Sequence, residues 1–311
     1  MSSWPTLDFA ADRPTIETAH FVLQMVGKLP TRLHPWINHG WHVALRVTPR
    51  GFATRMMPAA AARDFAVEVD MRDGLVRAWC SHGGSWTTEI AGKTIAQLHA
   101  DLTKMLAEAD LPAPLHGAPN ELPEVIPFAE DDRPREWDAD AATRLHGAFA
   151  AADRVFSIFR SRYLGKTSPS HLFWGSFDLA VTRFSGRRAP PHPGGFPNLP
   201  DEVTREAYSH EVISAGFWPG GNGVDEAAFY VYAYPSPDGL SEGAIQPNPA
   251  YWHKDLGEFV LHYADVASAD DPEAALMDFL QSSFDAAAAR MDWPDDLATP
   301  QVTYGEPAQH L

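Results

Sequence analysis

The chain has 311 residues, of which 45% are hydrophobic and 21% are charged, a normal composition for a globular protein with a sizeable core. Its 41 acidic and 24 basic residues give a net charge of −17, which argues against nucleic-acid binding, because such binding needs a basic face to neutralise phosphates. No apolar run approaches the ~20 residues that span a bilayer, and the N-terminal sequence lacks the features of a signal peptide. With Cys80 as the only cysteine, no intrachain disulfide can form, so we expect a cytoplasmic protein without a membrane partner.

The first 111 residues predict a helix, several antiparallel strands and a second helix. Residues 15–28 place Ile16, Ala19, Leu23 and Val26 at three- and four-residue spacing, which is typical of an amphipathic helix. Thr94 can cap a second helix that runs to about residue 109. The strands predicted between the two helices cover residues 41–47, 63–71, 75–80 and 85–90.

Prolines dominate the next segment, residues 112–138. Proline fixes φ and lacks a backbone donor, so this segment cannot form a helix interior or a central strand. We interpret it as a connector between a first unit, residues 1–111, and a second unit, residues 139–311. Its prolines stand at positions 112, 114, 119, 123, 127 and 134.

The second unit repeats the plan of the first. A long helix is predicted over residues 141–166 and a last helix from Asp271, with Pro272 at its first position, to about Met291. The strands predicted between them cover residues 177–184, 205–217, 227–234 and 257–263.

A short repeat in letters accompanies this repeated order. The first helix ends in "MVGK" (25–28) and the long helix ends in "YLGK" (163–166), which places "WHVAL" (41–45) over "FDLAV" (177–181). We therefore expect an α+β fold of two similar halves, each helix–antiparallel strands–helix, related by a pseudo-twofold axis and forming one compact unit. His42 and Asp178 would then occupy equivalent places.

Two phrases of the second unit identify a family. "FWGSFDLAVTRFSGRRAPPHPGG" (173–195) and "REAYSHEV" (205–212) resemble an uncharacterised bacterial family, known as a domain of unknown function, that covers most of a chain of this length. The resemblance implies a shared fold and a soluble bacterial protein. It implies no activity and assigns no catalytic residue.

Asp178 is the most unusual residue of the predicted strands, because apolar residues flank it on both sides. A carboxylate there is costly unless it is paired. An ion pair with Arg183, a partly wet face and a polar cavity all remain open. His171 and His210 could join Asp178 as acid–base groups, or as two histidines and a carboxylate around a divalent metal. His39 and His42 are further metal candidates, although clustered histidines are commonly hydrogen-bonded core groups.

A basic exit loop follows the same strand. Arg183 and Arg187 have the guanidinium geometry that binds carboxylates or phosphates, and five prolines stiffen residues 186–200 into an ordered loop over a pocket. We expect His192 and Trp174 to complete the substrate-binding wall.

No motif names a reaction. Position 214 is serine where a His-Glu-x-x-His zinc motif needs histidine, and Ser176 lies in no Gly-x-Ser-x-Gly elbow. The sequence therefore leaves open whether the protein is an enzyme. The favoured interpretation is an enzyme acting on a small anionic substrate in a cleft between the halves, through histidine and aspartate acid–base chemistry or a divalent metal. The alternatives are a non-catalytic small-ligand-binding protein and an interaction protein.

Overall fold

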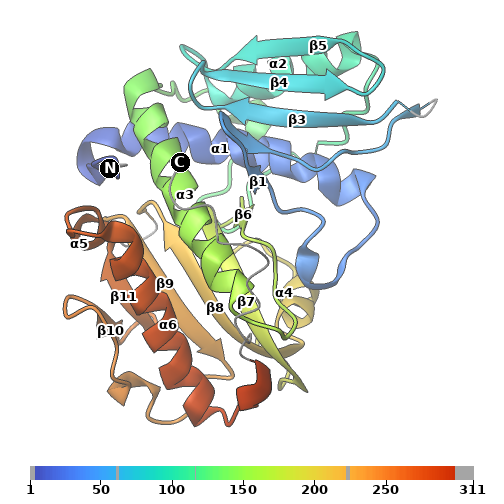
Figure 1. Ribbon diagram of the computed structural model, residues 1–311. Helices are drawn as coiled ribbons and strands as arrows, with labels where there is room; N and C mark the ends of the chain where they lie inside the picture. The colour runs from blue at the N-terminus through green and yellow to red at the C-terminus, as the bar shows by residue number, and fades with distance from the viewer. Residues whose placement is uncertain (1–3, 61–62, 116, 222–224, 298–311) are drawn as a thin grey trace.

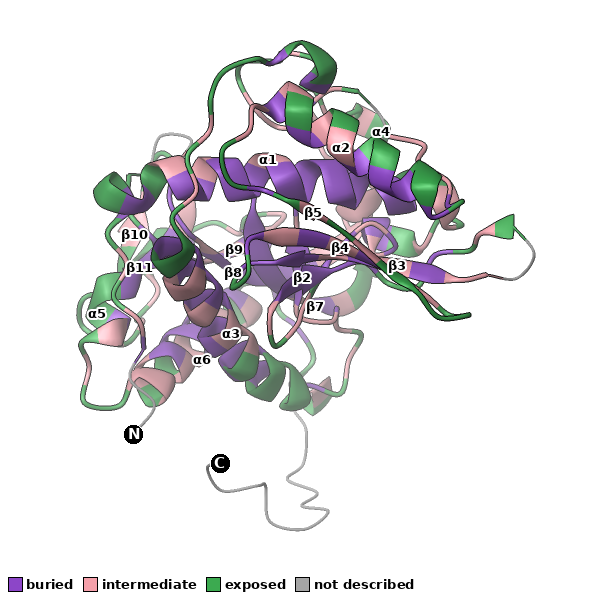
Figure 2. Ribbon diagram, turned by 90° about the horizontal axis from the view of Figure 1, so that it is seen from above, coloured by how far each residue is buried: buried purple, intermediate pink, exposed green. Residues whose placement is uncertain are grey.

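Two antiparallel sheets and a long buried helix organise the computed structural model of the protein, which describes residues 4–60, 63–115, 117–221 and 225–297. Helix α1 (Phe9–Leu33) runs between the sheets (Figure 1) and is buried along most of its length (Figure 2). The fold is therefore α+β with antiparallel sheets, which confirms the predicted class.

The first sheet has five strands in sequential order, each antiparallel to the next. Helix α2 (Ile95–Glu108) follows the sheet and begins at Thr94 with a capping box, in which the Thr94 hydroxyl accepts from the Gln97 backbone and the Gln97 side chain accepts from the Thr94 backbone. The helix start predicted at Thr94 is confirmed. The five strands are β1 (Arg46–Val47), β2 (Gly51–Ala53), β3 (Phe65–Asp70), β4 (Leu75–Cys80) and β5 (Ser85–Glu89).

The second sheet has six strands in the order β10-β11-β9-β8-β7-β6, and helices α3 (Ala139–Ser161) and α6 (Pro272–Arg290) lie against one of its faces (Figure 1). Asp271 caps α6 through the backbone of Ala274, as predicted. Short helices are α4 (Asp201–Ala207), α5 (Tyr263–Ala267), η1 (Asn38–Gly40), η3 (Phe128–Glu130), η4 (Leu240–Glu242) and η5 (Asp295–Leu297). The strands are β6 (His171–Phe173), β7 (Asp178–Arg188), β8 (His210–Trp218), β9 (Ala228–Tyr234), β10 (Tyr251–His253) and β11 (Glu258–His262).

The two faces of the six-stranded sheet differ in chemistry, because alternate residues of a strand point to opposite sides. The face toward α3 and α6, here called the helical face, carries apolar residues such as Leu179, Val181 and Phe217. The opposite face, here called the polar face, carries Asp178, Thr182, Ser214, Tyr230, Tyr232 and Glu258.

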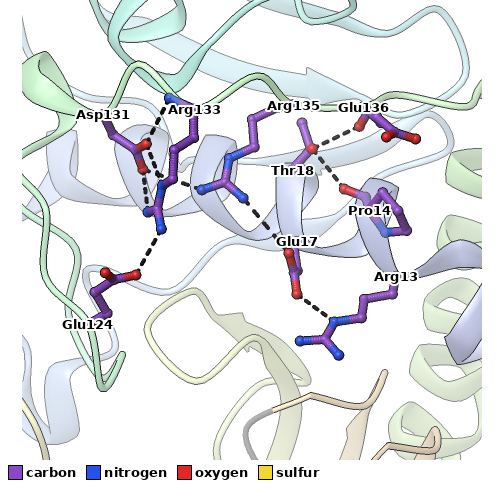
Figure 3. A network of polar contacts seen from close by, with 9 residues as sticks. All are labelled: Arg13, Pro14, Glu17, Thr18, Glu124, Asp131, Arg133, Arg135 and Glu136. Carbon is purple, nitrogen blue, oxygen red and sulfur yellow. Dashed lines mark hydrogen bonds and ion pairs between the residues drawn. The ribbon is translucent and has the colours of Figure 1, made fainter.

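The proline-rich connector is fixed to the surface of α1 by a polar network (Figure 3). The buried Asp131 carboxylate accepts from Arg133 at 2.7 and 2.8 Å and from Arg135 at 3.3 Å, and the Arg133 hydrogen bond holds the pKa of Asp131 below its usual range. The Thr18 hydroxyl of α1 lies 2.8 Å from the carbonyl of Glu136. The connector is therefore a packed part of the fold, and it has a defined route past the polar face.

A pair of backbone hydrogen bonds joins the two sheets. Leu45 and Leu172 each donate to the carbonyl of the other, at 2.9 and 2.7 Å, just before β1 and within β6.

Among the described residues, no helix combines the length and the apolar character that a bilayer crossing requires. The predicted unit boundaries at residues 111 and 139 stay predictions, and residues 298–311 of the second unit lie outside the described part.

The pseudo-twofold duplication is not confirmed. Residues 41–43 form a turn after η1 instead of the predicted strand, because His39 and Gly40 both take positive φ and turn the chain sharply before β1 begins at Arg46. β1 is an edge strand, whereas β7 lies inside its sheet. His42 and Asp178 therefore do not occupy equivalent places.

The strand predicted over 205–217 is too long. Its first three residues belong to α4, whose first turn holds the acidic residues Asp201 and Glu202, and acidic groups favour a helix N-terminus. Strand β8 begins only at His210.

Candidate functional site

Asp178 is buried at the start of β7 and finds neutral partners. Its Oδ1 accepts from the Ser176 hydroxyl at 2.5 Å, and its Oδ2 accepts from the hydroxyl of Tyr230. Burial raises the pKa of Asp178 even though both hydrogen bonds oppose the rise. The carboxylate is thus oriented by two hydroxyl donors, and no cation of the described residues pairs with it.

Tyr230 reaches Asp178 by lying across the neighbouring strand. It stands opposite Gly216, and a Cβ atom at that position would come within 2.1 Å of the Tyr230 ring. Glycine is thus required where one side chain crosses the backbone of β8. Burial raises the pKa of Tyr230 well above its usual value, so its hydroxyl stays a donor at physiological pH.

A second row of hydroxyl groups runs beside this contact. Thr182 and Ser214 lie 2.8 Å apart through their hydroxyl oxygens, and the hydroxyls of Tyr232 and Tyr208 are also 2.8 Å apart. The rings of Tyr230 and Tyr232 are stacked with centroids 5.9 Å apart. Burial raises the pKa of Tyr232 to about 12. The polar face therefore offers neutral hydroxyls and two aromatic rings.

Two half-buried glutamates complete the face, and sequence reasoning missed both. Glu121 comes from the connector and Glu258 begins β11. Burial, with the nearby Asp178 charge as the second cause, raises the pKa of each to about 7. Within the described ranges, neither glutamate carboxylate makes a hydrogen bond or an ion pair with another side chain.

Glu121 is held in a defined conformation. Its backbone has φ 58°, in the left-handed region that non-glycine residues rarely adopt, and its N–H donates to the Pro197 carbonyl at 2.9 Å. A Cβ atom added to Gly175 would lie 1.9 Å from Glu121 Oε1. The carboxylate therefore fits against a turn that only glycine leaves open.

Polar residues of α1 hold this turn and the connector together. His20 Nε2–H donates to the carbonyls of Trp174 and Gly175 at 2.9 and 3.0 Å, and burial lowers the pKa of His20 to about 4. Gln24 bonds both the N–H and the carbonyl of Asn120, each at 2.8 Å. Both side chains are buried, so a polar stripe of α1 positions Glu121 and Asp178 relative to each other.

Lys28 is the next residue of the same stripe, four residues after Gln24. It is 2% exposed, lies 4.9 Å from the centre of the Trp174 ring and donates to the Asn120 side chain. Burial lowers the pKa of Lys28 to about 8, and Glu121 opposes this effect. The spacing His20, Gln24, Lys28 is visible in the sequence and was the available signal, because these polar residues share one helix face.

The predicted histidines do not join Asp178. His171 packs against Trp41 and Phe173, with ring centroids 6.3 and 4.8 Å away, and burial lowers its pKa to about 3. His42 Nδ1 accepts from the Ile37 backbone at 3.3 Å beside the Trp36 ring.

His39 and His210 form a separate cluster at the other end of β7. The His39 ring donates from Nδ1 to the Ala207 carbonyl at 3.0 Å, accepts from Lys166 at Nε2 at 2.5 Å, and lies 6.2 Å from the His210 ring. The five metal candidates are thus spread over different places, and the described residues contain no group of three or more potential ligand side chains (His, Cys, Asp or Glu) arranged to hold a metal ion.

The predicted anion clamp does not face Asp178. Arg183 is five residues from Asp178 along β7 and so points to the helical face, where its guanidinium lies 3.4 Å from the centre of the Phe159 ring. Arg187 pairs with Glu211 at 2.9 Å and donates to the Met291 carbonyl at 2.5 Å. These contacts tie the end of β7 to the helical layer.

The proline-rich loop packs on the tyrosine side of the polar face. The His192 ring stacks on Tyr208 at 4.6 Å, and the Tyr234 hydroxyl donates to the Pro190 carbonyl at 3.0 Å. Trp174 lies elsewhere and donates to the Val43 carbonyl at 3.0 Å. His192 thus contributes ring packing at the polar face, whereas the Trp174 ring packs against Lys28 of α1.

Comparison with known proteins adds a family but no activity. No curated protein and no solved structure matches the chain. A family model matches residues 4–299, which include every element of both sheets. The chain therefore belongs to the family described as a family of unknown function, DUF5996.

Proposed function

We propose that the protein is an acid–base enzyme that acts on a small neutral or cationic substrate at the polar face. One observation carries this proposal: Glu121 and Glu258 are unpaired, half-buried carboxylates with pKa values of about 7, beside the buried Asp178. Groups that titrate near neutral pH and lack a structural partner are typical of proton-transfer sites.

The roles follow from protonation. Near neutral pH each glutamate is partly protonated, so one can give a proton to a substrate while the other accepts one. Asp178 is fixed by Ser176 and Tyr230, and its negative charge, when it is ionised, favours the protonated form of both glutamates. The Tyr232 hydroxyl is a neutral donor that can orient a substrate oxygen.

The charges of the face decide the class of substrate. The face combines the carboxyl groups of Asp178, Glu121 and Glu258, and only Glu121 interacts with an ammonium group, that of Lys28, so the face disfavours a substrate anion. The stacked rings of Tyr230 and Tyr232 can in addition contact a cation through their faces. The charges thus favour a neutral or cationic substrate over the anionic one expected from Arg183 and Arg187.

A metabolite-depletion experiment tests the proposal. Bacterial small-molecule extract is incubated with wild-type protein, with Glu121→Gln and with Glu258→Gln, and mass spectrometry follows which compounds disappear. We expect a neutral or cationic compound to be consumed by the wild type and at least about 100-fold more slowly by either variant. Glu89→Gln, at an exposed position of β5, is the matched control and should retain the wild-type rate.

The alternative of a non-catalytic binding protein has a different outcome. If the wild type consumes nothing yet retains a cationic compound through gel filtration, and both glutamine variants lose it, the face binds without catalysis. A cytoplasmic setting belongs to the same proposal and is supported by the single unpaired cysteine, Cys80.

A further inference from the structure

Arg183 lines a cavity on the helical face, on the other side of the sheet from the polar face. The cavity has a volume of about 250 Å³ and lies between the end of α3, the second half of α6 and the residues around η5. Its polar and aromatic lining includes Arg162, Tyr163, Gln281, Phe284, Asp285 and Trp293.

Two buried donors of this lining have no partner in the part of the chain that the structure describes. They are Nε of Arg183, a residue 1% exposed, and Nε1 of Trp293, a residue 6% exposed. The faces of the guanidinium are covered by Phe159 and Phe284, and its Nη2 donates to the Phe159 carbonyl. Buried donors without acceptors are costly, so an acceptor group at this place would be bound strongly.

The charge of Arg183 also lacks an ion-pair partner among the described residues. Burial lowers the pKa of Arg183 to about 9, and electrostatic interactions with Tyr163 and Asp285 oppose this effect. A carboxylate suits this position, because guanidinium and carboxylate form charge-assisted hydrogen bonds.

Acidic side chains line the same cavity. Asp285 accepts from Gln281 at 2.7 Å, and Asp295 lies at the wall formed by η5; within the described ranges neither makes an ion pair. The cavity lining therefore combines a buried guanidinium, two buried donors without acceptors and two carboxylates without ion pairs among the described residues.

We infer that this cavity binds a small zwitterion of the α-amino acid class, with its carboxylate toward Arg183 and Trp293 and its ammonium group toward Asp285. Since a water molecule occupies about 30 Å³, a cavity of about 250 Å³ holds roughly eight to ten heavy atoms, the size of an aliphatic amino acid. Phe284 and Ala288 supply an apolar wall for its side chain. This site is independent of the function proposed for the polar face.

Calorimetric titration with three matched compounds tests the inference. L-leucine carries both charged groups, 3-methylbutylamine lacks the carboxylate and 4-methylpentanoate lacks the amine. We expect leucine to bind the wild type at least about tenfold more tightly than either analogue, because each analogue leaves one side of the cavity unpaired.

Variants locate the site. Trp293→Phe keeps an aromatic ring and removes the free donor, and Asp285→Asn keeps the size and removes the charge; each should weaken leucine binding about five- to tenfold. Asp278→Asn, exposed on the same helix, and Glu121→Gln on the polar face should leave leucine binding unchanged. Absence of leucine binding to the wild type at 10 mM, equal binding of the analogues, or binding that ignores both cavity variants would overturn the inference.

Discussion

Removal of one charge at Glu121 should stabilise the protein at neutral and higher pH. In the folded protein, burial raises the pKa of Glu121 to about 7 from its ordinary 4.5. The folded state therefore binds this proton more tightly than the unfolded state does. The stability that this protonation gives is complete below pH 4.5 and is lost as the pH rises through 7.

The size of the effect follows from the same values. At about 1.4 kcal/mol per pKa unit, ionisation of Glu121 costs the folded state about 3 kcal/mol. Glutamine keeps the shape of the side chain beside Gly175 and cannot ionise. Glu121→Gln should therefore be more stable than the wild type by about 2–3 kcal/mol at pH 8 and about equal to it at pH 4.5.

Urea unfolding of both proteins at pH 4.5, 6, 7 and 8 measures this difference, and Glu89→Gln on the exposed edge of β5 should follow the wild type throughout. Carboxylates with lowered pKa, such as that of Asp131, change the stability of both proteins alike and cancel in the comparison. A Glu121→Gln variant that is less stable than the wild type at pH 8, or that differs from it equally at pH 4.5 and pH 8, would show that ionisation of Glu121 does not destabilise the fold.

Three further changes probe the polar face and the cluster beside it. Gly216→Ala should destabilise the fold by about 1–3 kcal/mol in urea unfolding, because its Cβ would meet the Tyr230 ring; an unchanged midpoint would contradict the close packing. Tyr230→Phe should lower the free energy of unfolding by about 1–3 kcal/mol, because it removes the hydroxyl that donates to the buried Asp178. The loss should be larger at pH 8 than at pH 5, because an ionised carboxylate needs this donor more than a protonated one does. Burial and, second, the Lys166 charge lower the pKa of His39, so Lys166→Met should raise this pKa in an NMR titration; a pKa that does not rise would contradict the effect of the lysine charge.

Much of the fold was readable from local patterns. Asp271 followed by Pro272, and Thr94 followed by Gln97, are short-range signals that fix where helices begin, and both helices start there. The failures came where a turn depends on unusual backbone angles. The local sequence around His39 gives no sign of a positive φ at this histidine. That backbone angle turns the chain, so residues 41–43 form a turn instead of the expected strand.

The site was predictable only in part. The apolar flanks of Asp178 correctly marked a buried carboxylate, because strand periodicity is local. Its partners were not predictable, since Tyr230 reaches it only across Gly216, and Glu121 arrives from a proline-rich segment with no periodicity. Arg183 was assigned to the wrong face, although the odd spacing of five residues from Asp178 already placed it on the other side of the strand.

The route of the connector sets limits on how the protein can be re-engineered. Asn120 and Glu121 are held by α1 on one side and by Pro197 on the other, so an inserted reporter or a protease cut at this point would separate the two ends that position the carboxylate. The tip of the β4–β5 hairpin at Gly83 is exposed, a Cβ atom added there would meet no described atom within 4 Å, and loop tips of this kind tolerate added sequence. A tag or a partner domain placed there would leave the polar face intact, whereas the same insertion at residue 120 would dismantle it while sparing every strand.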